Sequence, residues 1–183
     1  MATHLTGYEL TQTESQRKTK ILNAKQRTWD LYFLKLAEAV SVKSCDTSMK
    51  VGCIIVGPDN EIRTTGYNGF PRSVEPNKDR LERPVKYIFT EHAERNSIYN
   101  AARYGVSLQG CTAYIACTPR EKGGKAPCCD CTRALIQAGI SRIVQWNTPD
   151  VSEKDATRTW LENIKYSYEM LRETNMRLSY INE

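Results

Sequence analysis

The pattern of apolar and polar positions divides the chain into alternating helix-type and strand-type segments. Apolar side chains recur at helical spacing over residues 25–43 and again over residues 152–176. Short apolar runs bounded by turn-forming residues predict strands between them. The predicted strands are residues 50–57, 61–68, 111–118 and 141–147, and two further helices are predicted over 91–104, with Thr90 as N-cap, and over about 127–138.

The order α-β-β-α-β-α-β-α combines a hairpin with crossover units. It predicts an α/β fold in which helices cover both faces of a mixed sheet. Residues 1–24 lack a sustained apolar period and are expected to form an N-terminal arm. Residues 25–150 are expected to form the main domain, with 151–183 as a helical extension packed on it. The charged segment 72–90 is predicted to be a long loop.

Composition mainly excludes classes of protein. The chain has 183 residues, and its longest apolar run is far too short to span a bilayer. Its first residues lack the apolar region of a secretion signal, which favours the cytoplasm. Seven cysteines in that compartment are expected to be thiols or metal ligands. The net charge of +5 suits a phosphate-bearing ligand but is too small to indicate a nucleic-acid groove.

Two predicted helix starts carry the chemistry, with the sequences HAE and PCCDC. Cys128 and Cys131 are three positions apart and project to the same side of a helix, whereas Cys129 lies about 100° away. The chain has two histidines, and His4 lies in the polar arm, so an imidazole ligand beside these cysteines should be His92. Three nitrogen and sulfur ligands with one open position are typical of catalytic zinc.

Glu94 follows His92 by two residues, close enough to transfer protons beside a metal without binding it. The spacing H-x-E…P-C-x-x-C is the signature of zinc nucleobase deaminases. A redox-active or simply buried C-x-x-C is the alternative, but it would leave HAE unexplained. Of the other cysteines, Cys53 and Cys117 are expected in the core. The sequence indicates no role for Cys45 and Cys111.

On these motifs the chain resembles the cytidine deaminase superfamily, and within it the deoxycytidylate (dCMP) deaminases, including those of phages. The resemblance runs from Trp29 to about Trp146 through DTSMKVGCIIV, TTGYNGFPRSV, EHAERNSIYNAARYG and PCCDCTRALIQAGISRIV. It implies a three-layer α/β/α fold with a mixed five-stranded sheet and a zinc deaminase domain over residues 25–150. It also implies hydrolysis of dCMP to dUMP and ammonia, which would supply dUMP for thymidylate synthesis.

The resemblance also implies roles for individual residues. Zinc held by His92, Cys128 and Cys131 would lower the pKa of a bound water to about 7. Glu94 would act as base and then acid, at ring N3 and at the departing amino group. The implied substrate contacts are Asn68 to a sugar hydroxyl, Arg103 to the phosphate, the Ala93 N–H to the base edge, and Ser48, Lys50 and Thr118 around the pocket.

Proteins of this kind are commonly hexamers that dCTP activates and dTTP inhibits with Mg²⁺. The resemblance therefore implies a homo-oligomer with an effector site near the GYNGFP turn, without nucleic-acid or membrane partners. A phage-encoded protein would act in the host cytoplasm. The candidate effector residues are Gly69, Phe70, Arg72 and Lys78.

The chain departs from the family pattern at two places. Residues 120–126, REKGGKA, separate Thr118-Pro119 from Pro127 and are expected to be either a surface loop or a pocket-rim loop that contacts phosphate through Lys122 or Lys125. Trp146 stands near a position where relatives often carry tyrosine, and could be a pocket wall or core.

Two other functions stay open. A tRNA adenosine deaminase would share the zinc motif but needs a more basic face. A non-catalytic nucleotide-binding zinc module is disfavoured because Glu94 is present.

Overall fold

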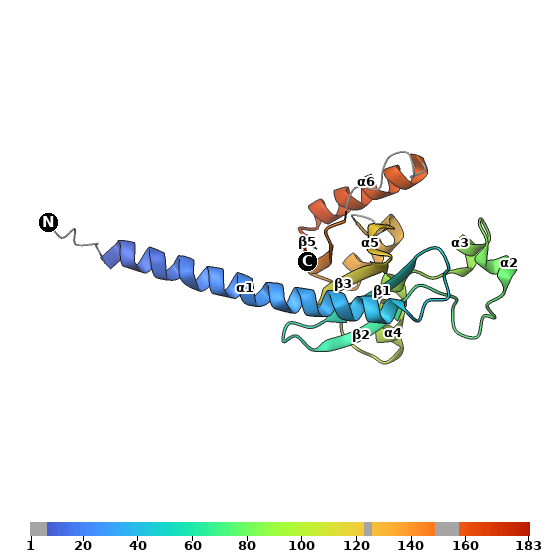
Figure 1. The fold of residues 1–183 in the computed structure, drawn as a ribbon, viewed down its shortest axis with the longest axis horizontal. Coiled ribbons are helices and arrows are strands. Elements are labelled where there is room, and N and C mark those ends of the chain that lie inside the picture. Colours follow the sequence, from blue (N-terminus) through green and yellow to red (C-terminus); the bar gives the residue numbers. More distant parts are fainter. Residues whose placement is uncertain (1–6, 123–125, 149–157) are drawn as a thin grey trace.

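The computed structural model describes residues 7–122, 126–148 and 158–183, and its centre is a five-stranded sheet (Figure 1). The strand order is β2-β1-β3-β4-β5. Strand β1 (Lys50–Val56) pairs antiparallel with β2 (Ile62–Tyr67) and with β3 (Thr112–Thr118), whereas β4 (Arg142–Trp146) and β5 (Arg177–Ile181) continue the sheet in parallel. The predicted mixed sheet is confirmed.

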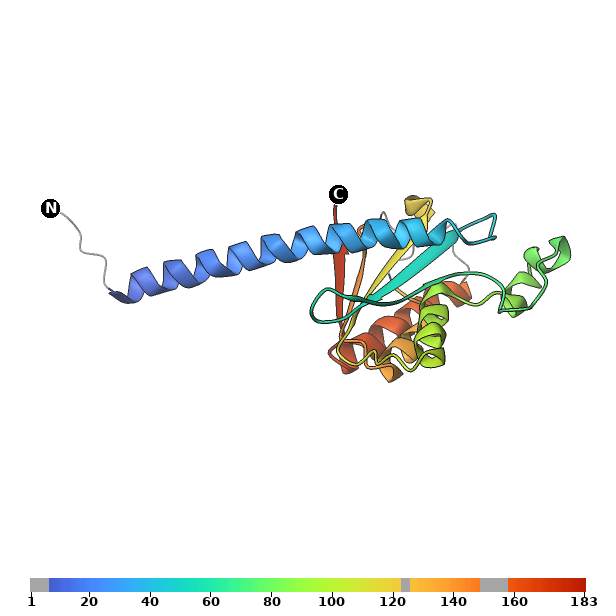
Figure 2. The same cartoon turned by 90° about the horizontal axis from the view of Figure 1, so that it is seen from below.

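Helices cover both faces of the sheet, as the sequence predicted. Figure 2 shows α1 (Gly7–Ser41) along one face and α4 (Ala93–Arg103), α5 (Cys129–Gln137) and α6 (Arg158–Glu173) against the other. Two short helices, α2 (Lys78–Leu81) and α3 (Lys86–Phe89), project beyond the end of the sheet (Figure 1). The prediction of an irregular loop over residues 72–90 is therefore wrong in part.

The central strands bury side chains on both faces, which explains their continuous apolar runs. In β1, Cys53 and Ile55 pack toward α4, whereas Ile54 and Val56 pack toward α1. Strands β3 and β4 alternate in the same way. Cys53 is fully buried and Cys117 is 9% exposed, so both cysteines predicted as core are confirmed.

Helix α1 is fixed to the sheet by a buried carboxylate. Asp30 is 2% exposed and accepts hydrogen bonds from the Tyr114 hydroxyl at 2.9 Å and from two nitrogens of Arg142 at 2.9 and 2.8 Å. The helix also approaches β1 closely, because a Cβ on Gly52 would stand 2.0 Å from the Ala37 carbonyl oxygen. Both contacts lock α1 across the centre of the sheet.

Helix α1 begins well before the predicted residue 25. Residues 7–24 belong to it, and this first part extends away from the sheet (Figure 1). The sequence predicted an arm over residues 1–24 without assigning it a secondary structure; over residues 7–24 it is helical, while residues 1–6 lie outside the described chain. In the described part of the chain, no helix combines the length and the apolar character needed to cross a bilayer.

Two boundaries near the ends of elements also differ from the sequence prediction. Helix α4 has His92 as N-cap, whereas Thr90, the predicted cap, ends α3. The helix predicted over residues 152–176 ends at Glu173, and strand β5 follows it. Residues 149–157 lie outside the described chain.

Candidate active site

The amino ends of α4 and α5 meet at one end of the sheet. The chain reaches α4 from β2 through α2 and α3, and it reaches α5 from β3 through residues 119–128. Both strands end beside the start of β1, since Tyr67 pairs with Gly52 and Thr118 pairs with Lys50. The topology therefore brings together two helix starts that are 36 residues apart in the sequence.

Three side chains from these helix starts form a compact cluster. The Nδ1 atom of His92 lies 3.5 Å from Cys128 Sγ and 3.4 Å from Cys131 Sγ, and the three ligand atoms lie within 4.8 Å of one another. A tetrahedral zinc with ordinary bond lengths separates its nitrogen and sulfur ligands by about 3.6 Å. The three predicted ligands therefore have the donor types and spacing that suit zinc, with a fourth position left open.

The protein groups alone already favour a thiolate in this cluster. A hydrogen bond from the Cys131 thiol, and a second one from His92, lower the pKa of Cys128 to about 4. The hydrogen bond between Cys131 and Cys128 raises the pKa of Cys131. The hydrogen bond between His92 and Cys128 raises the pKa of His92 to about 9. A divalent cation can replace the protons that these groups share, since metal binding releases protons.

Glu94 lies in the first turn of α4 with only 6% of its surface exposed. Burial raises the pKa of its carboxyl group, while the positive charge of His92 opposes that rise. A buried carboxyl group with a raised pKa beside possible metal ligands is typical of a proton-transfer residue.

The close packing of α4 on β2 fixes where His92 and Glu94 stand. A Cβ on Gly66 would lie 2.5 Å from the Ala93 carbonyl oxygen and 2.4 Å from the Ser97 backbone nitrogen. A glycine in β2 therefore lets the first turn of α4 rest directly on the strand. Gly66 falls within the predicted strand 61–68, and it lies inside β2.

Cys129 faces away from the cluster, as the helical geometry predicted. Its backbone nitrogen donates to Asn163 Oδ1 at 2.7 Å, and its thiol donates to the Asn163 carbonyl at 2.8 Å. One turn further, the Thr132 and Ser167 hydroxyls are 2.6 Å apart. Helix α6 thus supports α5 through residues other than the two cluster cysteines.

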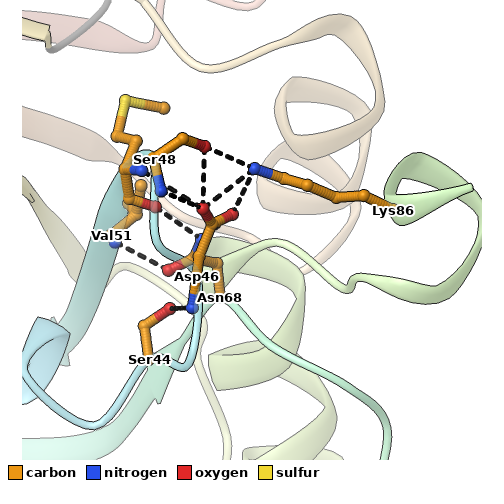
Figure 3. Close-up of polar contacts among 7 residues, drawn as sticks. Ser44, Asp46, Ser48, Val51, Asn68 and Lys86 are labelled. Atoms are coloured by element: carbon orange, nitrogen blue, oxygen red, sulfur yellow. Dashed lines mark hydrogen bonds and ion pairs between the residues drawn. The ribbon is translucent and has the colours of Figure 1, made fainter. Parts of the chain in front are cut away.

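The predicted substrate residues Ser48 and Asn68 lie in one polar network at the start of β1 (Figure 3). The Asn68 side chain accepts from the Val51 backbone nitrogen at 2.7 Å and donates to the Met49 carbonyl at 3.0 Å. Asp46 accepts from the Ser48 backbone nitrogen and hydroxyl, each at 2.8 Å. Asn68 therefore has a structural role, because it holds the turn that carries Ser48; its substrate contact stays a prediction.

Sequence reasoning missed two members of this network, Asp46 and Lys86. The Lys86 ammonium lies 2.6 Å from one Asp46 carboxylate oxygen and 2.9 Å from the other. The two residues are 40 positions apart, and Lys86 sits in a charged segment where a solvated lysine is the ordinary expectation. No local pattern could have singled it out.

The other predicted substrate residues are scattered. Lys50 is half-buried at the start of β1, and exposed Thr118 shares a 3.1 Å hydrogen bond with Ser41. Arg103 is exposed in the last turn of α4, about 15 Å from Ala93 along the helix axis. Within one chain, this geometry gives no support to a phosphate contact by Arg103.

Three of the four candidate effector residues lie in the loop after β2, and the fourth begins α2. The Gly69 backbone exchanges two hydrogen bonds with Glu91, and the Phe70 ring is 6.5 Å from that of Phe89. Arg72 donates to Asn100 on α4, whereas Lys78 begins α2.

Arg120 fixes the first part of the REKGGKA segment to the fold. It forms ion pairs with Glu38 of α1 and, at 2.6 Å, with Glu183, and its guanidinium lies 4.1 Å above the Trp146 ring. Trp146 is 5% exposed in the core beneath α1, which supports its core alternative. Residues 123–125 and the side chain of Lys122 lie outside what the structure describes, so the phosphate contact predicted for them is not addressed.

Arg120 and Trp146 also line a cavity of about 240 Å³ at the ends of β4 and β5. Its other lining residues are Glu121, Asn147, Thr148, Ile181 and Glu183, and it includes none of the three clustered ligand residues.

Comparison with known proteins connects the site to a family. The model of the cytidine and deoxycytidylate deaminase zinc-binding region matches residues 27–146. An uncharacterized deaminase in the luxG 3′ region of Aliivibrio fischeri is 33% identical over 84% of this chain and 93% of its own length. A probable deoxycytidylate deaminase of Caenorhabditis elegans is 31% identical over 76% and 68%, and the human deoxycytidylate deaminase is 33% identical over 63% of each chain.

Solved structures share the fold. The dCMP deaminase of cyanophage S-TIM5 in apo form superposes with a TM-score of 0.60 at 24% identity, covering 83% of this chain and 96% of that one. The same phage enzyme in complex with dCMP and dUMP gives a TM-score of 0.59 at 23% identity, covering 82% and 94%. These matches agree with the predicted cytidine deaminase-like fold.

Proposed function

Since the chain belongs to the cytidine and deoxycytidylate deaminase family, and is thus a deaminase, we propose that it hydrolyses dCMP to dUMP and ammonia. The observation that carries this proposal is the buried Glu94 carboxyl group beside a His-Cys-Cys cluster whose ligand atoms have the spacing of a tetrahedral zinc site. The named relatives support dCMP as the substrate.

His92, Cys128 and Cys131 would hold the zinc ion. A zinc ion in this position supplies Lewis-acid activation of water, whose pKa falls to about 7. Helix α4 presents the imidazole and α5 presents both sulfurs, so the packing of these two helices sets the arrangement of the ligands.

Glu94 would move two protons during the reaction. It accepts the first from the attacking water and donates it to ring N3, which makes C4 electrophilic. After the water oxygen has bonded to C4, Glu94 transfers the remaining water proton to the amino group, which departs as ammonia. A carboxyl group that serves as base and acid benefits from a raised pKa, and burial raises that of Glu94.

The substrate would lie between the amino end of α4 and the turn before β1. The Ala93 N–H would donate to the base edge, and Asn68 and Ser48 would stand on the sugar side, with Lys50 and Thr118 nearby. Arg103 stays a prediction for the phosphate contact. Regulation by dCTP and by dTTP with Mg²⁺, at Gly69, Phe70, Arg72 and Lys78, and a hexameric state rest on the resemblance alone.

The test is loss of cytosine absorbance by the zinc-loaded protein with dCMP, deoxycytidine, cytidine and dCTP as separate substrates. We expect turnover of dCMP, with ammonia released in equal amount and the nucleosides much poorer substrates. A lack of dCMP turnover, with or without dCTP and Mg²⁺, would reject the proposal. An unmodified tRNA in a parallel assay tests the adenosine deaminase alternative.

A further inference from the structure

Lys86 joins the projecting helices α2 and α3 to the domain through one buried ion pair. The lysine is 9% exposed and Asp46 is 5% exposed, and the ammonium contacts both carboxylate oxygens. Lys86 is the buried residue of α3, and α2 has none. A lysine is rarely buried unless it is paired with an opposite charge. The burial of Lys86 against Asp46 therefore calls for an explanation.

Asp46 organises the turn between α1 and β1. Its Oδ1 atom accepts from the Ser48 backbone nitrogen at 2.8 Å, from the Ser48 hydroxyl at 2.8 Å and from the Met49 backbone nitrogen at 3.2 Å. The Lys86 ammonium also donates to the Ser48 hydroxyl oxygen at 2.6 Å. Lys86 therefore neutralises the carboxylate and orients the Ser48 hydroxyl at the same time (Figure 3).

The same network reaches the residue that precedes His92. Asn68 donates to Asp46 at 3.4 Å and to the Met49 carbonyl at 3.0 Å. The next residue, Gly69, exchanges backbone hydrogen bonds of 3.0 and 2.8 Å with Glu91. The turn that Asp46 orders therefore connects through Asn68 and Gly69 to the start of α4.

We propose that Lys86 is a positioning residue for the nucleotide: through Asp46 it holds the turn of residues 46–49, and with it Ser48 and Asn68, in the geometry that binds substrate. This inference rests on the proposed function. Lys86 contacts Asp46 and Ser48 rather than the metal cluster, so its effect on substrate is transmitted through them.

Loss of the ammonium would leave a buried carboxylate without its counter-charge. The unpaired Asp46 must then either take up a proton or turn toward water; the first change weakens the hydrogen bonds that order Ser48 and Met49, and the second breaks them. Zinc binding and proton transfer by Glu94 depend on the α4 and α5 helix starts. These are held independently by the packing of α4 on Gly66 and by the contact of Cys129 with Asn163. The defect should therefore appear in substrate binding.

The experiment measures kcat and KM for dCMP, and zinc content, in wild type and in Lys86→Met, Lys86→Arg and Lys165→Met. Lys165→Met is the matched control, because that side chain is 70% exposed on α6. For Lys86→Met we expect KM to rise about ten- to hundredfold, kcat to change far less, and zinc to be retained. Lys86→Arg should recover most of the loss, since it keeps the charge.

An unchanged KM in Lys86→Met would overturn the inference, as would a loss of kcat that merely follows the fraction of folded or zinc-loaded protein. If Lys86→Met fails to fold, Asp46→Asn combined with Lys86→Met replaces it, since that pair removes both charges. A KM like that of wild type in the folded double variant would then overturn the inference. If wild type itself does not convert dCMP, the proposed function falls and the inference with it, whereas active wild type with an indifferent Lys86 rejects the inference alone.

Discussion

His92 and Cys128 occupy equivalent positions, each as the N-cap of its helix, and their side chains meet with Nδ1 and Sγ 3.5 Å apart. Neither side chain caps its own helix by a hydrogen bond. An N-cap serine or aspartate typically stabilises a helix by about 1 kcal/mol, so two such contributions are given up here. In return, the positive end of α5 favours a thiolate at the cluster.

Metal content should separate the three cysteines of α5 and its N-cap. We expect Cys128→Ser and Cys131→Ser to lose zinc, because each removes one of only three protein ligands. Cys129→Ser is the matched control, since its thiol contacts Asn163 instead. Zinc measured by mass spectrometry after dialysis against a mild chelator decides the matter, and zinc retained in Cys131→Ser would contradict the assignment.

Replacement of Glu94 by Gln should abolish turnover without removing the metal. The amide keeps the shape of the side chain but cannot transfer protons, and such groups typically contribute about 10²- to 10⁴-fold in rate. Steady-state kinetics with dCMP and zinc analysis of the same sample are the measurements. Glu169→Gln, on the exposed face of α6, should leave both values unchanged. A Glu94→Gln protein without zinc would show that Glu94 is itself a ligand.

Gly66→Ala should destabilise the protein and disturb the candidate site. The new methyl group would meet the backbone of Ala93 and Ser97 at 2.4–2.5 Å, so the first turn of α4 must shift. Overpacking of this kind costs about 1–3 kcal/mol in the free energy of unfolding. Urea denaturation and zinc affinity should both report the loss. Gly57→Ala is the milder comparison, because its nearest atoms belong to the flexible side chains of Glu61 and Arg63.

The sheet was predictable because its central strands are buried on both faces. That burial produces apolar runs such as VGCIIV, which few other structures explain. Strand β5 was not predicted because it is short and only half-buried, so its residues RLSYI do not form a continuous apolar run. The first part of α1 was not predicted as helix for a related reason. Its residues, including Ile21 and Leu22, are exposed, so they do not form the apolar stripe by which a helix is recognised in a sequence.

The metal cluster was predictable because ligand chemistry admits few residue types. One histidine and two cysteines at helix starts left almost no alternative set. The pair of Asp46 and Lys86 depends instead on tertiary structure, since its members are 40 residues apart and resemble surface charges in the sequence. Interactions of this kind follow from the fold and carry no local signature.

Asp30→Ala should weaken the attachment of α1 without touching the candidate site. It leaves the Arg142 guanidinium and the Tyr114 hydroxyl without their buried partner. Breaking a buried pair in this way typically costs about 3–5 kcal/mol in the free energy of unfolding. Glu169→Ala removes an exposed pair on α6 and should cost less than about 1 kcal/mol. Equal losses in the two variants would contradict this account of α1.

Stability should depend on pH through Asp46. Burial alone would raise the pKa of this carboxyl group, but the hydrogen bonds from Lys86 and from Ser48 and Met49 hold it below its ordinary value of 3.8. A lowered folded pKa adds stability above pH 3.8 that is lost as the pH falls through the folded value. The difference in unfolding free energy between wild type and Asp46→Asn should therefore shrink below about pH 4. A difference that stays constant down to pH 2 would contradict the ion pair.

The convergence of the two helix starts has a topological consequence for the REKGGKA segment. A metal bound to both His92 and Cys128 would close a loop of the polypeptide chain 36 residues long. This loop contains β3 and all seven residues from Arg120 to Ala126. The entropy lost on closing a ring grows only with the logarithm of its length, so those seven residues add about 0.2 kcal/mol to the closure. The length of the segment between β3 and the cysteine motif is therefore almost free of thermodynamic constraint. Residues can be added there while the metal ligands keep their positions.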